Sequence, residues 1–153
     1  MSLAENKALV RRLYEELWGR GNLAVVDECV ARDYVNHQRT IDPHVDAPMS
    51  AVDICGAEIF KQLVQAWRRG FPDVETSVEE QIAEGDKVVT RWVSRGTHSG
   101  PWMQVPASGH SMVVEGISID RVAGGKIVES WTNWDLLGLL EQIGASRDAT
   151  GPG

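Results

Sequence analysis

The chain has 153 residues, of which 42% are hydrophobic and 24% charged, a composition typical of one globular domain with its own buried core. Fifteen basic residues against 22 acidic ones give a formal net charge of -7, which argues against nucleic acid or an anionic membrane as the main partner. No apolar run approaches the roughly 20 residues that span a bilayer, and no signal-peptide pattern begins the chain, so we expect a cytoplasmic protein.

The first half of the chain is predicted to be largely helical. Leucine, valine and tyrosine residues repeat at helical spacing over residues 4–20, and a short second helix is predicted in NLAVVDECVARDYVNH, followed by a turn into Tyr34. A third helix is predicted in GAEIFKQLVQAWRRGF. It should end before Pro72, because proline cannot continue a helix.

The segment between the second and third predicted helices has no periodic pattern. Residues 38–56 carry two prolines and three aspartates, and they are long for a loop in a compact domain. Loops of this length are often lids over a site or disordered segments. We therefore predict a lid-like insertion at 38–56, while a disordered loop has the same sequence signature.

The second half of the chain is predicted to be β-structure followed by a helix. Strands are expected at 74–83, 88–98, 111–122 and 126–134, a closing helix at 136–143 and a loose tail at 145–153. Residues 1–144 then form a single α+β domain, in which a curved antiparallel sheet carries the N-terminal helices over its concave face and a short C-terminal helix follows. Such a domain encloses one pocket, and six tryptophans suit a flat apolar cavity.

Three stretches of the sequence resemble one family: LVRRLYEELWGRGNLAVVDECVARDYVNH, GTHSG and GGKIVESW with the following WDLLGLLEQIG. They are similar to the SnoaL-like polyketide cyclases, and the resemblance runs from residue 5 to residue 144 apart from the 38–56 insertion. That family has the nuclear-transport-factor-like cone fold of ketosteroid isomerase and scytalone dehydratase. Its characterised cyclases close a ring of an aromatic polyketide ester by an intramolecular aldol condensation. The resemblance thus implies a cone-shaped cavity, a small hydrophobic ligand, no metal or cofactor, and a homodimer.

The resemblance also implies where the catalytic groups of a cyclase should lie. The family has an acid/base aspartate in the last strand, with a histidine and a glutamine on the neighbouring strand. When the chain is aligned through GGKI and QIG, these positions fall on Thr132, Ser118 and Gly116. A threonine hydroxyl has no useful pKa near neutrality, so Thr132 cannot replace the carboxylate as a base. The resemblance therefore predicts the fold but not the cyclase mechanism.

Two other residues are candidates for catalysis. His37 follows the second predicted helix, and a neutral imidazole with a pKa near 6.5 makes it the leading candidate for the base. The neighbouring Asn36 could hold an enolate or ester oxygen, although both side chains could instead satisfy backbone groups at a turn. Asp135 either caps the last helix or turns its carboxylate into the pocket. Strand alternation places it opposite Thr132, which favours the cap.

Further candidates for substrate binding lie on the predicted strands. Ser118, Thr132 and Trp134 face the cavity if the family register holds, and Trp134 is either part of an aromatic wall or packed under the first helix. Arg91 and Trp92 point to opposite faces of their strand, and the sequence does not decide which of them reaches the pocket. The four histidines have no metal-ligand spacing, so no metal site is predicted.

Three kinds of function fit these observations. The first is a cofactor-free enzyme that acts on a small hydrophobic carbonyl or ester compound by aldol-type cyclisation, isomerisation, dehydration or hydrolysis. The second is a module that binds a hydrophobic ligand without transforming it, and the third is an interaction protein that dimerises through the exposed sheet face. The predicted lid favours the enzyme, because closure over a pocket suits a substrate.

Overall fold

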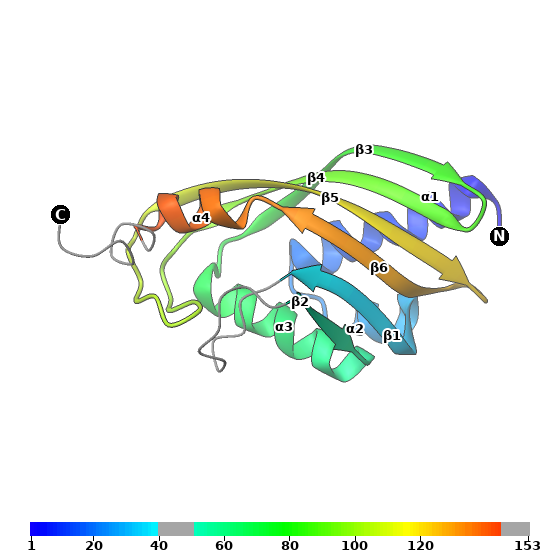
Figure 1. The fold of residues 1–153 in the computed structure, drawn as a ribbon, viewed down its shortest axis with the longest axis horizontal. Coiled ribbons are helices and arrows are strands. Elements are labelled where there is room, and N and C mark those ends of the chain that lie inside the picture. The colour runs from blue at the N-terminus through cyan, green and yellow to red at the C-terminus, as the bar shows by residue number, and fades with distance from the viewer. Residues whose placement is uncertain (40–50, 145–153) are drawn as a thin grey trace.

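The protein is a six-stranded curved sheet covered on its concave side by helices, seen in a computed structural model that describes residues 1–39 and 51–144 (Figure 1). The strands are β1 (Val30–Arg39), β2 (Ala51–Cys55), β3 (Glu75–Glu84), β4 (Lys87–Thr97), β5 (Ser111–Ala123) and β6 (Lys126–Trp134). They lie in the order β2-β1-β6-β5-β4-β3. The predicted α+β class and the curved sheet are confirmed.

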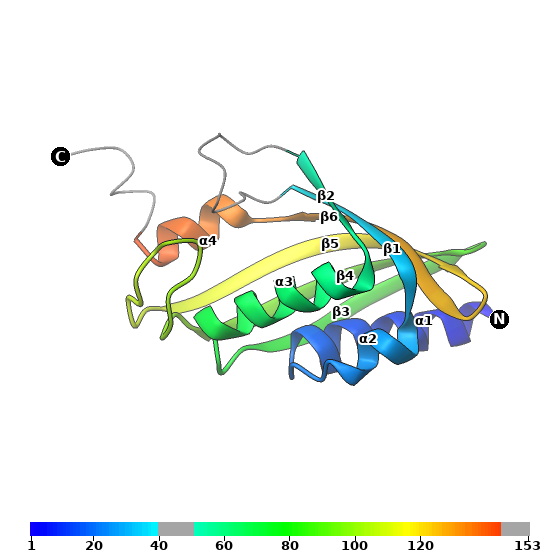
Figure 2. The same cartoon turned by 90° about the horizontal axis from the view of Figure 1, so that it is seen from below.

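The helices are α1 (Leu3–Arg12), the π-helix η1 (Leu13–Trp18), α2 (Ala24–Cys29), α3 (Ala57–Gly70) and α4 (Leu136–Gln142). Seen from below, α1, α2 and α3 lie under the concave face of the sheet, while α4 follows β6 at one end of the molecule (Figure 2). Helix α3 ends at Gly70, two residues before Pro72, as the sequence predicts.

The sheet is mixed rather than wholly antiparallel, because β1 pairs with β6 in the parallel direction and with β2 in the antiparallel direction. Neither β1 nor β2 is predicted from the sequence, which indicates a turn at Tyr34 and an insertion at 38–56. The two ends of that insertion, at 38–39 and 51–55, are in fact paired strands. Residues 40–50, the middle of the predicted lid, and the tail at 145–153 lie outside the described residues.

The first predicted helix is divided into two kinds of helix. Its start is fixed by a capping box, in which Ser2 Oγ accepts a hydrogen bond from the Glu5 backbone N–H at 3.1 Å. From Leu13 the hydrogen bonding widens, and the Gly19 N–H donates to the Tyr14 carbonyl five residues earlier at 2.9 Å. Such π-turns often occur at functional sites. Here the turn carries Tyr14 and Trp18, which both face the space under the sheet.

Strand β5 shows how the sequence positions side chains on the concave face. Its even-numbered residues from Met112 to Val122 are buried, while the odd-numbered residues from Val113 to Ile119 are exposed. The same alternation turns Gly116, Ser118 and Asp120 towards the helices.

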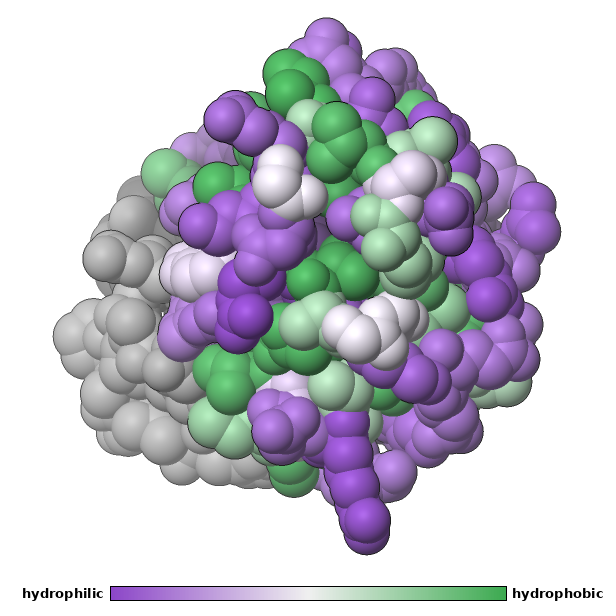
Figure 3. Space-filling model, turned by 90° about the vertical axis from the view of Figure 1, so that its right-hand side faces the viewer, coloured by the Kyte–Doolittle hydropathy of each residue, from purple (hydrophilic) through white to green (hydrophobic). Residues whose placement is uncertain are grey.

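The outer surface is mixed in character. On the face that carries the N-terminus, hydrophobic side chains are grouped near the centre and hydrophilic ones lie around them (Figure 3). Within the described part of the chain, no helix is long and apolar enough to cross a membrane.

Candidate functional site

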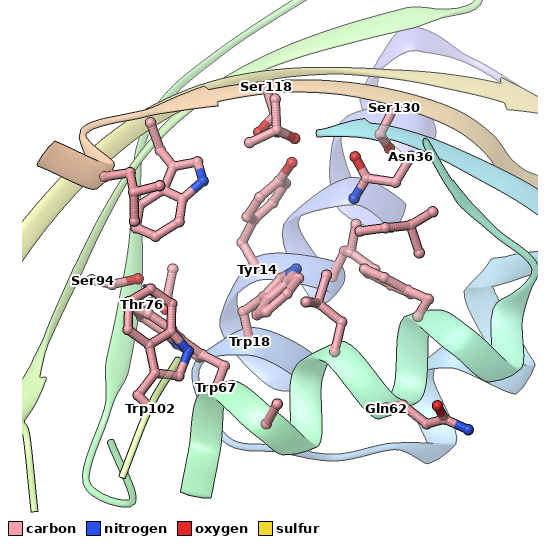
Figure 4. A pocket seen from close by; sticks show the side chains of 18 of the residues that line it. Tyr14, Trp18, Asn36, Gln62, Trp67, Thr76, Ser94, Trp102, Ser118 and Ser130 are labelled. Carbon is pink, nitrogen blue, oxygen red and sulfur yellow. Dashed lines mark hydrogen bonds between the residues drawn. The ribbon is translucent and has the colours of Figure 1, made fainter. Parts of the chain in front are cut away.

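A cavity of about 640 Å³ lies between the concave face of the sheet and the helices η1 and α3 (Figure 4). This volume suits a drug-sized organic molecule. Its walls are rich in aromatic side chains, with five of the six tryptophans of the chain among the lining residues: Trp18, Trp67, Trp92, Trp102 and Trp134. Walls of this kind offer flat apolar surface to a flat ligand.

Three of the tryptophans form a rigid cluster at one end of the cavity. Trp67 packs edge to face against Trp102 and Trp134, with ring centroids 5.4 and 5.9 Å apart, and the Trp102 and Trp134 centroids are 6.2 Å apart. Thr76 and Ser94 lie beside this cluster, and their hydroxyl oxygens are 2.7 Å apart. Because these two hydroxyls bond to one another, the tryptophan cluster provides most of the surface at this end of the cavity.

A group of polar residues lies on the sheet side of the cavity and is called the polar floor here: Tyr14, Asn36, Ser118, Ser130 and Thr132. Gln62, Arg69 and Gln104 line the cavity elsewhere. Figure 4 shows the Tyr14 hydroxyl pointing from η1 towards Ser118, with Ser130 and Asn36 close together on the neighbouring strands. The Trp92 indole N–H donates to Ser118 Oγ at 3.1 Å, and Ser118 Oγ lies 3.2 Å from Thr132 Oγ1. The floor therefore consists mainly of hydroxyl groups.

A buried carboxylate lies directly behind the polar floor. Asp120 on β5 is fully buried, and the Tyr14 hydroxyl donates to its Oδ2 at 2.9 Å while the Ser130 hydroxyl donates to its Oδ1. Burial raises the pKa of Asp120 from 3.8 to about 6, and the hydrogen bonds from Ser130 and Tyr14 offset only part of that rise. Asp120 is not among the residues predicted from the sequence, although strand alternation from Ser118 places it on the inward face.

Five of the predicted binding residues line this cavity: Asn36, Trp92, Ser118, Thr132 and Trp134. Their part in binding a substrate stays a prediction. Trp134 packs against other tryptophans instead of lying under the first helix. Arg91 is exposed and lies outside the lining of this cavity, so Trp92 is the residue of that pair that reaches the site.

Gly116, where the resemblance predicts the family's glutamine position, has no room for a side chain. A Cβ atom on Gly116 would lie 2.2 Å from Cζ2 of Trp92, which is far inside van der Waals contact. The indole thus fills the space next to the strand and places its N–H against Ser118. A side chain at 116 and this position of Trp92 exclude each other.

The prediction that His37 is the base needs a correction, because the His37 side chain points away from the described residues that line the cavity. Its Nε2 lies 2.7 Å from Glu129 Oε2, and its ring stacks on Trp131 with centroids 5.3 Å apart. Glu129 also accepts a hydrogen bond from Arg121 at 3.1 Å. Since β1 alternates, Asn36 faces the cavity and His37 faces the outer side of the sheet, so the prediction of His37 as the base does not fit this cavity.

Asp135 occupies the other position for which two interpretations were open. It is exposed, lies outside the cavity lining, and accepts a hydrogen bond from the Gly138 N–H at 2.9 Å as the N-cap of α4. This geometry is that of a helix cap. The predicted catalytic role of Asp135 therefore has no geometric support in this cavity.

Comparison with known proteins identifies the family. The model of the SnoaL-like polyketide cyclases matches residues 8–143. The chain belongs to this family. No match was found among the curated proteins. This SnoaL-like protein is similar in structure to a Jannaschia sp. CCS1 protein assigned to the SnoaL-like polyketide cyclases, with 27% identity, 93% of each chain covered and a TM-score of 0.79.

Two Streptomyces proteins are also similar in structure. TsrD from Streptomyces laurentii is 25% identical, with 95% of this chain and 98% of TsrD covered and a TM-score of 0.79. IdmH from Streptomyces antibioticus, assigned as a polyketide cyclase, is 31% identical, with 91% of this chain and 98% of IdmH covered and a TM-score of 0.73. These likenesses agree with the fold and with the family.

Residues 1–39 and 51–144 contain no group of three or more histidine, cysteine, aspartate or glutamate side chains that could hold a metal ion. The predicted absence of a metal and of any other cofactor stays a prediction.

Proposed function

We propose that this SnoaL-like protein is a cofactor-free enzyme that binds a flat, mainly apolar compound with a carbonyl or ester group and promotes acid–base chemistry at that group. Aldol-type cyclisation, isomerisation, dehydration and hydrolysis all belong to this chemistry. The observation that carries the proposal is that tryptophan walls and a group of hydroxyls on the sheet side line the same cavity. A ligand that stacks on the walls brings its carbonyl group to the hydroxyls of the floor.

Thr132 has a role in this proposal that needs no base. An indole N–H can only donate, so Ser118 Oγ accepts a hydrogen bond from Trp92. The Ser118 hydroxyl can then donate a hydrogen bond to Thr132 Oγ1. The Thr132 proton can then point into the cavity. A hydroxyl held in this way stabilises the oxygen of a carbonyl as negative charge develops on it. Thr132 thus replaces the family's acid/base aspartate by a hydrogen-bond donor.

A binding module that does not transform its ligand is the alternative, and product formation separates it from the enzyme. We expect aromatic polyketide esters, terpenoids or steroids to be converted by the wild-type protein, with conversion followed by mass spectrometry. Ala66 lines the cavity on α3, so Ala66→Phe should fill it and abolish conversion. The neighbouring Gln65 is exposed, and Gln65→Phe is the matched control. Saturable binding without any product would support the binding module.

We also propose that the protein forms a homodimer through the outer face of the sheet. Ile117 and Ile119 on β5 are 52% and 36% exposed, and Ile119 lies next to Trp131 in the register with β6. Apolar side chains grouped on one sheet face are typical of an interaction surface. Sedimentation equilibrium should give a dimer for the wild type and a monomer for Ile117→Lys. A wild-type monomer at all concentrations would contradict the dimer.

A further inference from the structure

Asp120 is a buried carboxylate that the function proposed above does not use. It is not part of the cavity lining, yet it accepts hydrogen bonds from two hydroxyls that are, those of Tyr14 and Ser130. We infer that Asp120 holds the proton of this site and exchanges it with the ligand through the Tyr14 hydroxyl. This inference rests on the proposed function and adds the group that takes the proton. Tyr14 is the catalytic residue in it, and Asp120 acts through Tyr14.

The direction of the hydrogen bond favours such a relay. The Tyr14 O–H points to Asp120 Oδ2 at 2.9 Å, so the lone pairs of its oxygen face away from the carboxylate. The Ser118 hydroxyl lies beside that oxygen, and Tyr14 is part of the cavity lining. The second oxygen of Asp120 is held by Ser130. The carboxylate is thus held on both sides, and the two hydroxyls that hold it, those of Tyr14 and Ser130, both line the cavity.

The surroundings of Asp120 leave it free to take up and release a proton near neutral pH. Tyr14 faces Asp120 from η1 and Ser130 faces it from β6. Tyr34 on β1 lies beside Ser130, and the residue that pairs with Asp120 on β4 is Val88. No charged side chain of the described residues contributes to the rise of its pKa to about 6, which comes from burial. Burial and the Asp120 charge also raise the pKa of Tyr14, so Tyr14 stays neutral.

The proton transfers balance. The ionised Asp120 accepts the Tyr14 hydroxyl proton while the Tyr14 oxygen takes a proton from the carbon next to the ligand's carbonyl. The C–H bond breaks, its electron pair becomes the enolate, and Tyr14 remains neutral with the ligand's proton. When the enolate carbon forms its new bond, the alkoxide that results takes the Tyr14 proton, and Tyr14 recovers a proton from Asp120. No proton is gained or lost over the cycle.

The inference is tested with 2-tetralone, a flat bicyclic ketone with acidic protons next to its carbonyl. In D₂O, the wild type should accelerate deuterium uptake at that carbon, measured by NMR, and the protein-dependent rate should rise with pH through a pKa near 6. Tyr14→Phe and Asp120→Asn should each reduce the rate by about 10²–10⁴-fold, the usual effect of acid–base catalysis, while tryptophan quenching shows that 2-tetralone still binds. Glu115→Gln removes an exposed carboxylate from the same strand and serves as the control.

Two outcomes separate the inference from the function on which it rests. If the wild type does not bind 2-tetralone at all, the proposed function fails together with the relay. If Asp120→Asn binds it and exchanges at the wild-type rate with the same pH profile, the relay alone is overturned. A measurement without ligand stands beside these: infrared difference spectra should show a carboxyl group protonating near pH 6 in the wild type and in Glu115→Gln, but not in Asp120→Asn. Asp120 that stays ionised well below pH 5 contradicts the relay.

Discussion

Single side chains decide which chemistry this cavity can perform. The resemblance places the family's acid/base aspartate position at Thr132, whereas the buried carboxylate behind the polar floor is Asp120, on a different strand and bonded to Tyr14. Alternation along β5 predicts this orientation from Ser118, so Asp120 could be found from the sequence. Its bond to Tyr14 could not, because the two residues are 106 positions apart and meet only in the folded chain.

Gly116 and Trp92 provide a prediction at the same scale. Gly116→Ala should destabilise the protein by about 1–3 kcal/mol, the usual cost of overpacking, because the added Cβ collides with the indole. Chemical denaturation measures the loss. The double variant with Trp92→Phe should lose less than the sum of the two single variants, since the smaller ring leaves room for the Cβ. Additive losses would show that the contact between position 116 and the Trp92 indole does not affect the free energy of unfolding.

Elements differ in how far the local sequence predicts them. Helix α3 follows from the spacing of Phe60, Val64 and Trp67, which are all buried. Strands β1 and β2 do not follow, because β1 begins directly after α2 and takes its place through parallel pairing with β6, almost 100 residues later. That pairing turns Asn36 into the cavity and His37 out of it. The sequence therefore predicted the residue pair but not which of the two faces the site.

Helix α4 allows the two interpretations of Asp135 to be tested directly. As an N-cap, Asp135→Ala should lower the free energy of unfolding by about 0.5–2 kcal/mol, whereas Asp135→Asn should lose little, because asparagine caps about as well. Thermal unfolding measures this difference. Both variants should keep the wild-type rate of deuterium exchange into 2-tetralone. A large fall in that rate with Asp135→Asn would show that Asp135 takes part in the reaction.

At the scale of the whole molecule, Asp120 makes stability depend on pH. Its folded pKa of about 6 lies above the ordinary value of 3.8, so the folded state binds the proton more tightly than the unfolded chain does. This contribution is fully present below pH 3.8 and is lost as the pH rises through 6. It amounts to about 3 kcal/mol, as an order of magnitude.

The variant Asp120→Asn should therefore be destabilised more, relative to the wild type, at pH 4.5 than at pH 7.5. Urea unfolding of both proteins at the two values measures the difference, and the other carboxylates cancel in the comparison. Glu115→Gln should show no such dependence. An equal effect of Asp120→Asn at both pH values would mean that Asp120 has an ordinary pKa.

The measurement that tests the central claim most directly is a titration of the intrinsic tryptophan fluorescence with aromatic polyketide esters, terpenoids and steroids. Five tryptophans line the cavity, so a ligand bound there should quench the emission saturably, and Ala66→Phe should remove the quenching while Gln65→Phe keeps it. The class that quenches names the substrates to assay. Emission that no class changes, or quenching that survives in Ala66→Phe, would contradict a ligand site in this cavity.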